Sequence, residues 1–111
     1  MSPRRPPDES DPLATTMALI GDRWTMLVVR ELVGGGKKFK ELSGALDGIP
    51  PKVLSDRLKR LEAEGLVRRV IYSSHPLRAE YHLTGRGKTL SPVMDAITSW
   101  GRTQKRYPEP K

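Results

Sequence analysis

The feature that most restricts the fold of this chain is one change in the spacing of its apolar residues. Up to Glu64 they recur at every third or fourth position, which is typical of helices that bury one face. From Leu66 to Leu83 the pattern becomes extended and rich in β-branched residues, with clean alternation only in its second half. Gly65 lies between the two regions, where it can end a helix. The chain is therefore predicted to be a mainly helical α+β protein.

Capping and helix-breaking residues divide the first region into four helices. Asp11 is a suitable N-cap before Pro12, and the glycines at 34–36 end the second helix because glycine makes helix continuation costly. The predicted helices cover residues 12–20, 23–33, 39–46 and 51–64, with Asp22 capping the second and a turn at 47–50 preceding the fourth.

The second region is predicted to be a β-hairpin followed by a last helix. Strands are expected at 66–73 and 79–83, joined by a loop at 74–78. Thr84 can cap the last helix, and Pro92 should either kink that helix or mark its effective start. Two short helices joined by a tight turn and followed directly by a hairpin define a winged helix-turn-helix, in which the hairpin is the wing.

Length and composition indicate one domain, expected at 11–105, in a chain of 111 residues. The Pro-rich and charged tails at 1–10 and 106–111 are predicted to be disordered. The absence of cysteine excludes a disulfide scaffold. No apolar run approaches the roughly 20 residues that span a bilayer, and the first ten residues lack the apolar core of a signal peptide. The expected location is the cytosol, with no membrane partner.

The fourth helix carries the clearest functional pattern. Leu54, Leu58 and Leu61 lie on one side and must face the core. The opposite side presents hydrogen-bonding and cationic groups near its N-terminal end, which is the end that enters the major groove in this motif. The candidate DNA contacts on this helix are Pro51, Lys52, Ser55, Asp56, Arg57 and Lys59.

These candidates have different expected partners. Lys52 suits a guanine or a phosphate, and Ser55 can bond to a base or a phosphate. Asp56 is repelled by phosphates, so it either accepts from a cytosine amine or pairs with Lys52 or Lys59. The alternative is an amphipathic surface helix with a solvated charged face. The basic hairpin that follows favours double-stranded DNA as the partner.

The excess of 20 basic over 13 acidic residues gives a net charge of +7, and such a field attracts nucleic acid. His75 and Arg78, at the predicted hairpin loop, are expected to contact the phosphate backbone or the minor groove. Arg68 and Arg69 either contribute to this contact or merely lie on an exposed strand. A further group of predicted phosphate contacts precedes the third helix and consists of Lys37, Lys38 and Lys40.

The last helix carries a stripe of apolar residues, namely Leu90, Val93, Met94, Ile97 and Trp100. This stripe presents more apolar surface than one small domain covers, and its exposure would promote aggregation. A two-fold partner is the simplest way to bury it, so the stripe is predicted to form a dimer interface.

No arrangement of residues predicts an enzyme, a catalytic residue, a metal site or a cofactor. His75 and His82 are the only histidines, and no cysteine accompanies them at zinc-binding spacing. The glycines and lysines at 34–38 lack the pattern of a phosphate-binding loop. A small-molecule pocket remains an alternative to simple core and interface packing, and its lining would be Trp24, Tyr81, Met94 and Trp100.

Several segments resemble the HxlR-type winged-helix regulators, distant relatives of the MarR-type repressors. The matching strings are Ile20–Leu32, Lys38–Leu42 and Gly48–Leu58, with further pieces at 61–68, 72–76 and 79–87, ending at Trp100. The resemblance implies a sequence-specific transcriptional regulator, most simply a repressor. It also implies a homodimer whose N- and C-terminal helices, including Leu13 and Met17, pack between subunits and present two recognition helices to a pseudo-palindromic operator.

Two alternatives to this function are a nucleic-acid-binding architectural protein without sequence preference and a ligand-responsive regulator with a pocket at the dimer interface. The chain also departs from the family pattern twice. Asp11 stands where members often carry a cysteine that senses oxidants or electrophiles, so cysteine-based sensing cannot be transferred. Pro50 stands where serine is common, so the recognition helix either has a weaker cap or is fixed by the rigidity of Pro50 and Pro51.

Overall fold

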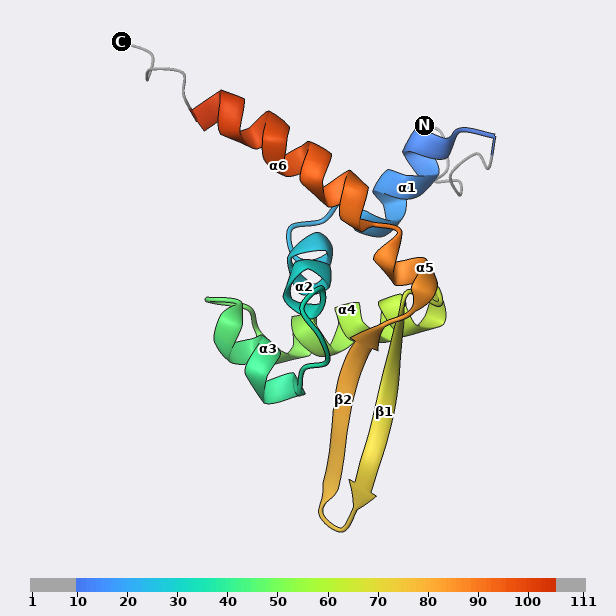
Figure 1. Ribbon diagram of the computed structural model, residues 1–111, viewed down its shortest axis with the longest axis vertical. Coiled ribbons are helices and arrows are strands. Elements are labelled where there is room, and N and C mark those ends of the chain that lie inside the picture. The colour runs from blue at the N-terminus through green and yellow to red at the C-terminus, as the bar shows by residue number, and fades with distance from the viewer. Residues whose placement is uncertain (1–9, 106–111) are drawn as a thin grey trace, which may run out of the picture.

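The computed structural model describes residues 10–105, which form six helices and a two-stranded antiparallel sheet (Figure 1). This order confirms the predicted mainly helical α+β winged helix-turn-helix. Apart from Ser10, the predicted tails lie outside the described residues. The elements are α1 (Pro12–Ile20), α2 (Thr25–Leu32), α3 (Phe39–Ala45), α4 (Pro51–Ala63), β1 (Val67–Ser74), β2 (Leu77–Leu83), α5 (Gly85–Lys88) and α6 (Ser91–Lys105).

The starts of α1 and α2 both depend on an aspartate. The Asp11 carboxylate accepts a hydrogen bond from the Ala14 amide at 3.1 Å, which confirms the predicted cap. Asp22 accepts from the amides of Trp24 and Thr25 at 2.8 and 3.0 Å. Because these side-chain bonds hold the first turn, α2 begins at Thr25 instead of the predicted residue 23.

The core lies where α2, α3 and α4 meet the base of the wing. Most of its side chains are aliphatic, as the low aromatic content requires. The buried cluster consists of Val28, Val29, Leu32, Leu42, Leu46, Ile49, Leu54, Leu58, Leu61, Leu66, Val67 and Leu83. The three leucines predicted to face inward from α4 are all in this set, so α4 is fixed on the body of the domain along its whole inner face.

The hairpin turn is shorter than predicted. Ser74 pairs with Leu77, so only His75 and Pro76 connect the strands, and the expected loop at 74–78 is wrong. The Ser73 hydroxyl donates to the Pro76 carbonyl at 2.9 Å and stabilises this tight connection. Arg78 is consequently a residue of β2 and not of the loop. The register also shifts between Ile71 and Ser73, which leaves Tyr72 as the extra residue of a β-bulge.

The last helix is split into two. Thr84 accepts from the Gly87 amide at 3.0 Å and caps only the short α5. The longer α6 begins at Ser91, with Pro92 in its first turn, so Pro92 marks a helix start and does not kink a continuous helix. Figure 1 shows α6 projecting from the body, with α1 on the same side and the wing at the opposite end. Within residues 10–105, no helix is long and apolar enough to cross a bilayer.

Candidate nucleic-acid interface

The predicted recognition helix has the expected two-sided character. Leu54, Leu58 and Leu61 are at most 1% exposed. On the outer side Lys52, Asp56 and Lys59 are exposed and Ser55 is half-buried, as is Arg57. Pro51 is the first residue of the helix and is also exposed. The structure therefore places all the α4 candidates away from the core.

The start of α4 is built from two prolines. Pro50 is the N-cap, has an extended backbone and offers no side-chain hydrogen bond. Its carbonyl accepts from the Leu54 amide at 3.0 Å and begins the helical ladder. Since the ring of each proline fixes φ, rigidity takes the place of the side-chain cap that serine would supply.

Arg57 is bound to the rest of the protein through a carboxylate that precedes α2. Its Nε donates to Asp22 Oδ1 at 3.1 Å, and its Nη1 donates to Asp56. Of the two alternatives for Asp56, pairing with Lys52 or Lys59 is not found, because its partner is the adjacent arginine. Lys52, Ser55 and Lys59 remain available for DNA, whereas Arg57 already has partners within the chain.

Asp22 is the centre of a small polar cluster that connects α2 to α4. Thr25, which is buried, donates its hydroxyl to Asp22 at 2.5 Å. Arg60 lies 3.9 Å from the same carboxylate and donates to the carbonyls of Ala18 and Leu19 at 3.0 and 3.3 Å. Partial burial would raise the pKa of Asp22, but the hydrogen bonds from Thr25, the Trp24 amide and Arg57 outweigh it and lower that pKa to about 2.

Sequence reasoning missed this cluster. Asp22 was predicted only as a helix cap, and Arg57 was predicted as a DNA contact. The two residues are 35 positions apart, and no local pattern links them. The one available signal was the spacing of Arg57 and Arg60, which places two cations on neighbouring turns of α4. The cluster positions the recognition helix relative to the start of α2.

The three lysines before and within α3 have different environments. The Lys37 ammonium donates to the Glu31 carbonyl at 3.2 Å, where it compensates the C-terminal end of α2. The Lys37 backbone also pairs with Tyr81 and attaches this segment to the wing. The Lys38 amide donates to the Glu41 carboxylate at 2.8 Å, and the side chains of Lys38 and Lys40 are exposed.

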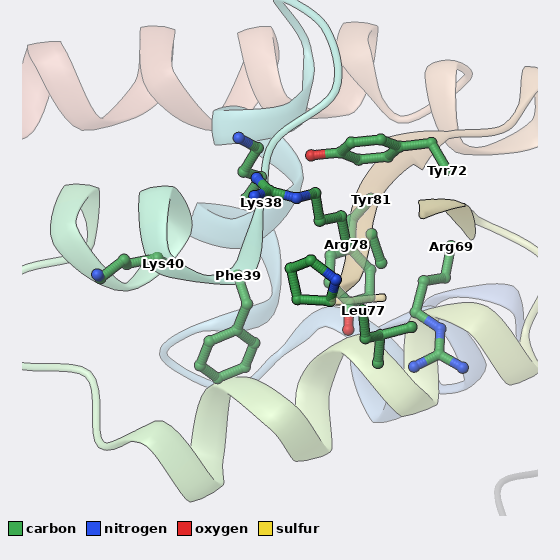
Figure 2. Close-up of a pocket in the computed structure, with 10 residues that line it drawn as sticks. Lys38, Phe39, Lys40, Arg69, Tyr72, Leu77, Arg78 and Tyr81 are labelled. Carbon is green, nitrogen blue, oxygen red and sulfur yellow. The ribbon is translucent and has the colours of Figure 1, made fainter. Parts of the chain in front are cut away.

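A cavity of about 460 Å³ lies between the start of α3 and the wing (Figure 2). It gathers Lys38, Lys40 and Arg78 from the predicted DNA contacts, together with Arg69, for which the sequence left two interpretations open. The remaining lining residues are apolar or aromatic: Phe39, Tyr72, Pro76, Leu77, Ala79 and Tyr81. His75, at the turn, lies outside this lining, and its ring nitrogen is 3.3 Å from the Ser74 hydroxyl.

The residues predicted to form a dimer interface separate into two groups. Leu90 and Met94 pack against the core of their own chain. The other members of the predicted set remain exposed, from 38% for Val93 to 71% for Leu13, and the full list is Leu13, Met17, Val93, Ile97 and Trp100. The described residues therefore leave an apolar surface on α1 and α6 that the chain itself does not cover.

The residues of the alternative small-molecule pocket do not line one common cavity among residues 10–105. Of Trp24, Tyr81, Met94 and Trp100, only Tyr81 lines the cavity beside the wing. None of the four lines a second cavity of about 400 Å³ between α1, the end of α4 and α5. Within residues 10–105, no three side chains of the His, Cys, Asp or Glu types come together as metal ligands.

Comparison with known proteins agrees with this architecture. Residues 19–108 match the HxlR-like helix-turn-helix family. The chain is 42% identical to the HTH-type transcriptional regulator YvaP of Bacillus subtilis, over 74% of this chain and 76% of YvaP. It is 40% identical to the HTH-type transcriptional regulator Rv3095 of Mycobacterium tuberculosis over 91% of this chain, and this match spans only 63% of Rv3095. The solved structure of the redox regulator HypR in its reduced form superimposes with a TM-score of 0.81 at 31% identity, covering 86% of this chain and 95% of HypR.

Proposed function

We propose that this chain, which belongs to the HxlR-like helix-turn-helix family of transcriptional regulators and not to a family of enzymes, is a homodimeric repressor. In this proposal it recognises a pseudo-palindromic operator through α4 and contacts the flanking backbone with its wing. Binding over a promoter would block transcription by occlusion, which needs nothing beyond α4, the wing and the exposed apolar surface on α1 and α6.

The observation that carries the proposal is the construction of α4. Its inner face is anchored by three fully buried leucines, and its position is further held by the contact of Arg57 with Asp22. Lys52 and Ser55 project from the first half of the helix, where a lysine can reach guanine or phosphate and a hydroxyl can bond to a base edge. A rigidly held helix with polar groups at its leading end is suited to reading base pairs.

The exposed apolar surface on α1 and α6 supports a homodimer. Large exposed residues such as Trp100 and Ile97 favour association, and a symmetric partner would cover the same surface on both subunits. In Figure 1, α1 and α6 lie at the end of the molecule opposite to the wing, so a partner there would leave α4 and the wing accessible. Two recognition helices related by a two-fold axis would meet successive major grooves roughly 34 Å apart.

The competing function is an architectural protein that binds nucleic acid without sequence preference. The net charge of +7 would serve that function equally well. The orientation of α4 favours the regulator, because a purely electrostatic contact does not need a rigid helix with mixed polar and charged groups on its outer face.

The ratio of specific to non-specific affinity decides between the two. Fluorescence anisotropy at physiological salt should compare a duplex from the DNA upstream of the protein's own gene with a shuffled duplex of equal length. A regulator should prefer its site by roughly 10³-fold or more. A ratio near one, found also with duplexes selected from a random pool, would contradict the proposal and favour the architectural protein.

Variants of α4 test whether this helix reads the sequence. Lys52→Ala and Ser55→Ala should each weaken operator binding, by about 1–3 kcal/mol where a base contact is lost, with reduced discrimination at one position. Lys88→Ala is the matched control, because it removes one exposed cation from α5. Operator affinity equal to that of the wild type in the Lys52→Ala, Ser55→Ala double variant would contradict the role given to α4.

A further inference from the structure

We infer that the cavity between α3 and the wing is a binding site for a small aromatic anion, such as an arylcarboxylate, and that its occupation releases the protein from DNA. The second part of this inference rests on the proposed function. The cavity, of about 460 Å³, falls in the range of roughly 300–1,000 Å³ that is usual for small-molecule sites. It would supply a switch to a regulator that has no cysteine.

The charge of the lining determines the sign of the ligand. Four cations line the cavity, and no acidic residue does. Figure 2 shows Arg78 extending from β2 toward Lys38, whereas Lys40 and Arg69 point away from these two residues. In the part of the chain that the structure describes, neither the Lys38 ammonium nor the Arg78 guanidinium has an ion-pair partner. Glu41 accepts only from the Lys38 backbone amide. An oxyanion bound in this cavity would offset the repulsion between these cations and accept charge-assisted hydrogen bonds from them.

The aromatic lining determines the shape of the ligand. Tyr72, Tyr81 and Phe39 all border the cavity, and aromatic faces favour a flat unsaturated partner. Regular alternation would place Tyr72 on the face of β1 opposite to Arg69, yet both line this cavity. The β-bulge at Tyr72 removes the conflict, because an extra residue re-aims the side chain. The wing thus departs from regular pairing at the residue that completes the aromatic wall.

The coupling to DNA follows from shared residues. Lys38 and Lys40 were predicted to contact phosphates, and Arg78 the phosphate backbone or the minor groove; the same side chains line the cavity. An anion held between Lys38 and Arg78 neutralises charge that phosphates would otherwise use, so ligand and DNA are expected to compete. The same cations could instead serve only as a phosphate seat, in which case an aromatic ring would add nothing to the affinity.

Calorimetry with the full chain tests the site without DNA. The probes are 2-naphthoate, the uncharged 2-naphthamide of the same shape, and inorganic phosphate. We expect 2-naphthoate to bind roughly 10-fold or more tighter than either comparison probe, because only it combines the charge with the ring. Equal affinity for the naphthoate and the amide would overturn the anion site. Equal affinity for the naphthoate and phosphate would overturn the aromatic part and leave only a site for a DNA phosphate.

Variants locate the site and separate it from the proposed function. Arg78→Gln and Lys38→Gln should each weaken 2-naphthoate roughly 10-fold, and Tyr72→Leu should weaken it while leaving phosphate unchanged. Arg68→Gln is the matched control, since it removes an exposed wing cation that does not line the cavity. The far-ultraviolet circular dichroism spectrum and the midpoint of thermal unfolding show for each variant whether it remains folded.

Anisotropy then measures operator affinity with and without 2-naphthoate. A loss of affinity caused by 2-naphthoate that Tyr72→Leu abolishes supports the switch. Tight operator binding in a protein that ignores 2-naphthoate overturns this inference and leaves the proposed function intact. Binding of 2-naphthoate by a protein that shows no operator preference overturns the proposed function and leaves the anion site intact.

Discussion

Helices α4 and α6 are similar in length and amphipathic pattern, but the chain covers the apolar face of only one of them. The apolar face of α4 is fully covered, with Leu54 and Leu61 at 0% exposure. On α6, Ile97 and Trp100 are 53% and 67% exposed, and only the first turns pack on the core. The comparison teaches that one sequence pattern can be covered within the chain on one helix and left exposed on another, where it favours association. The difference lies in whether other elements of the chain reach that face.

The largest effect is expected from truncation in the covered helix. Leu58→Ala should lower the free energy of unfolding by about 2–5 kcal/mol, because it leaves a cavity in a tightly packed core. The matched variant Ile97→Ala should cost less than about 1 kcal/mol when both are measured in a monomeric Trp100→Glu background. Urea denaturation gives both values. Equal losses would show that α6 is as well covered within one chain as α4.

Trp100 tests the uncovered helix, with a somewhat smaller effect on association. Trp100→Glu places a charge on the exposed apolar surface, and the dimer dissociation constant should rise roughly 30-fold or more. Ser99→Glu adds the same charge one position away from the stripe and serves as the control. Sedimentation equilibrium measures assembly, and an operator titration should show a parallel loss. A wild-type chain that is monomeric at micromolar concentration, yet binds a half-site tightly, would contradict the dimer.

The comparison also shows how far sequence alone could go. The spacing of leucines predicted the inner face of α4, and the change of period predicted the wing. The same reasoning grouped Met94 with Val93 and Trp100, whereas Met94 packs on the core of its own chain. The point at which α6 leaves the body of the domain decides which residues of the stripe are covered by the chain. That point depends on tertiary packing.

Two parts of the site depended on long-range geometry. The contact of Arg57 with Asp22 joins segments that are distant in sequence, so Arg57 was predicted to bind DNA although its guanidinium is held within the chain. The cavity beside the wing depends on a shift of strand register that brings Tyr72 and Arg69 into the lining of the same cavity. Register of this kind is set when the strands pair, and imperfect alternation in β1 was its only trace in the sequence.

A smaller effect on stability is expected from the ion pair between Asp22 and Arg57, which holds α4 in place. The described contacts of α6 include no such ion pair. The pKa of Asp22 is lowered to about 2 from an ordinary 3.8, so its contribution to stability is complete above about pH 4. This contribution is lost as the pH falls from about 4 to about 2. Asp22→Asn should therefore cost about 1–2 kcal/mol at neutral pH and almost nothing at the acid end.

Urea denaturation of the wild type and of Asp22→Asn across this range measures the difference directly. Asp95→Asn is the matched control, because it removes one carboxylate from an exposed position of α6. It should change stability by less than about 0.5 kcal/mol at neutral pH. A difference between the wild type and Asp22→Asn that does not shrink below pH 4 would show that the carboxylate acts through packing and not through its charge.

The smallest expected effect, none, concerns oxidation at the α1 and α6 end of the molecule. Asp11 occupies the position where the family resemblance would place a sensing cysteine, and here its carboxylate caps α1. The sequence has no thiol, and its four methionines do not react with diamide. Diamide should therefore leave operator affinity unchanged in an anisotropy titration. Asp11→Cys is the positive control, because mass spectrometry should show that diamide oxidises a thiol placed there. Rapid release of the wild-type protein from DNA by diamide, reversed by dithiothreitol, would mean that a thiol-independent redox step acts on this surface, and the assignment of α1 and α6 to purely apolar association would be wrong.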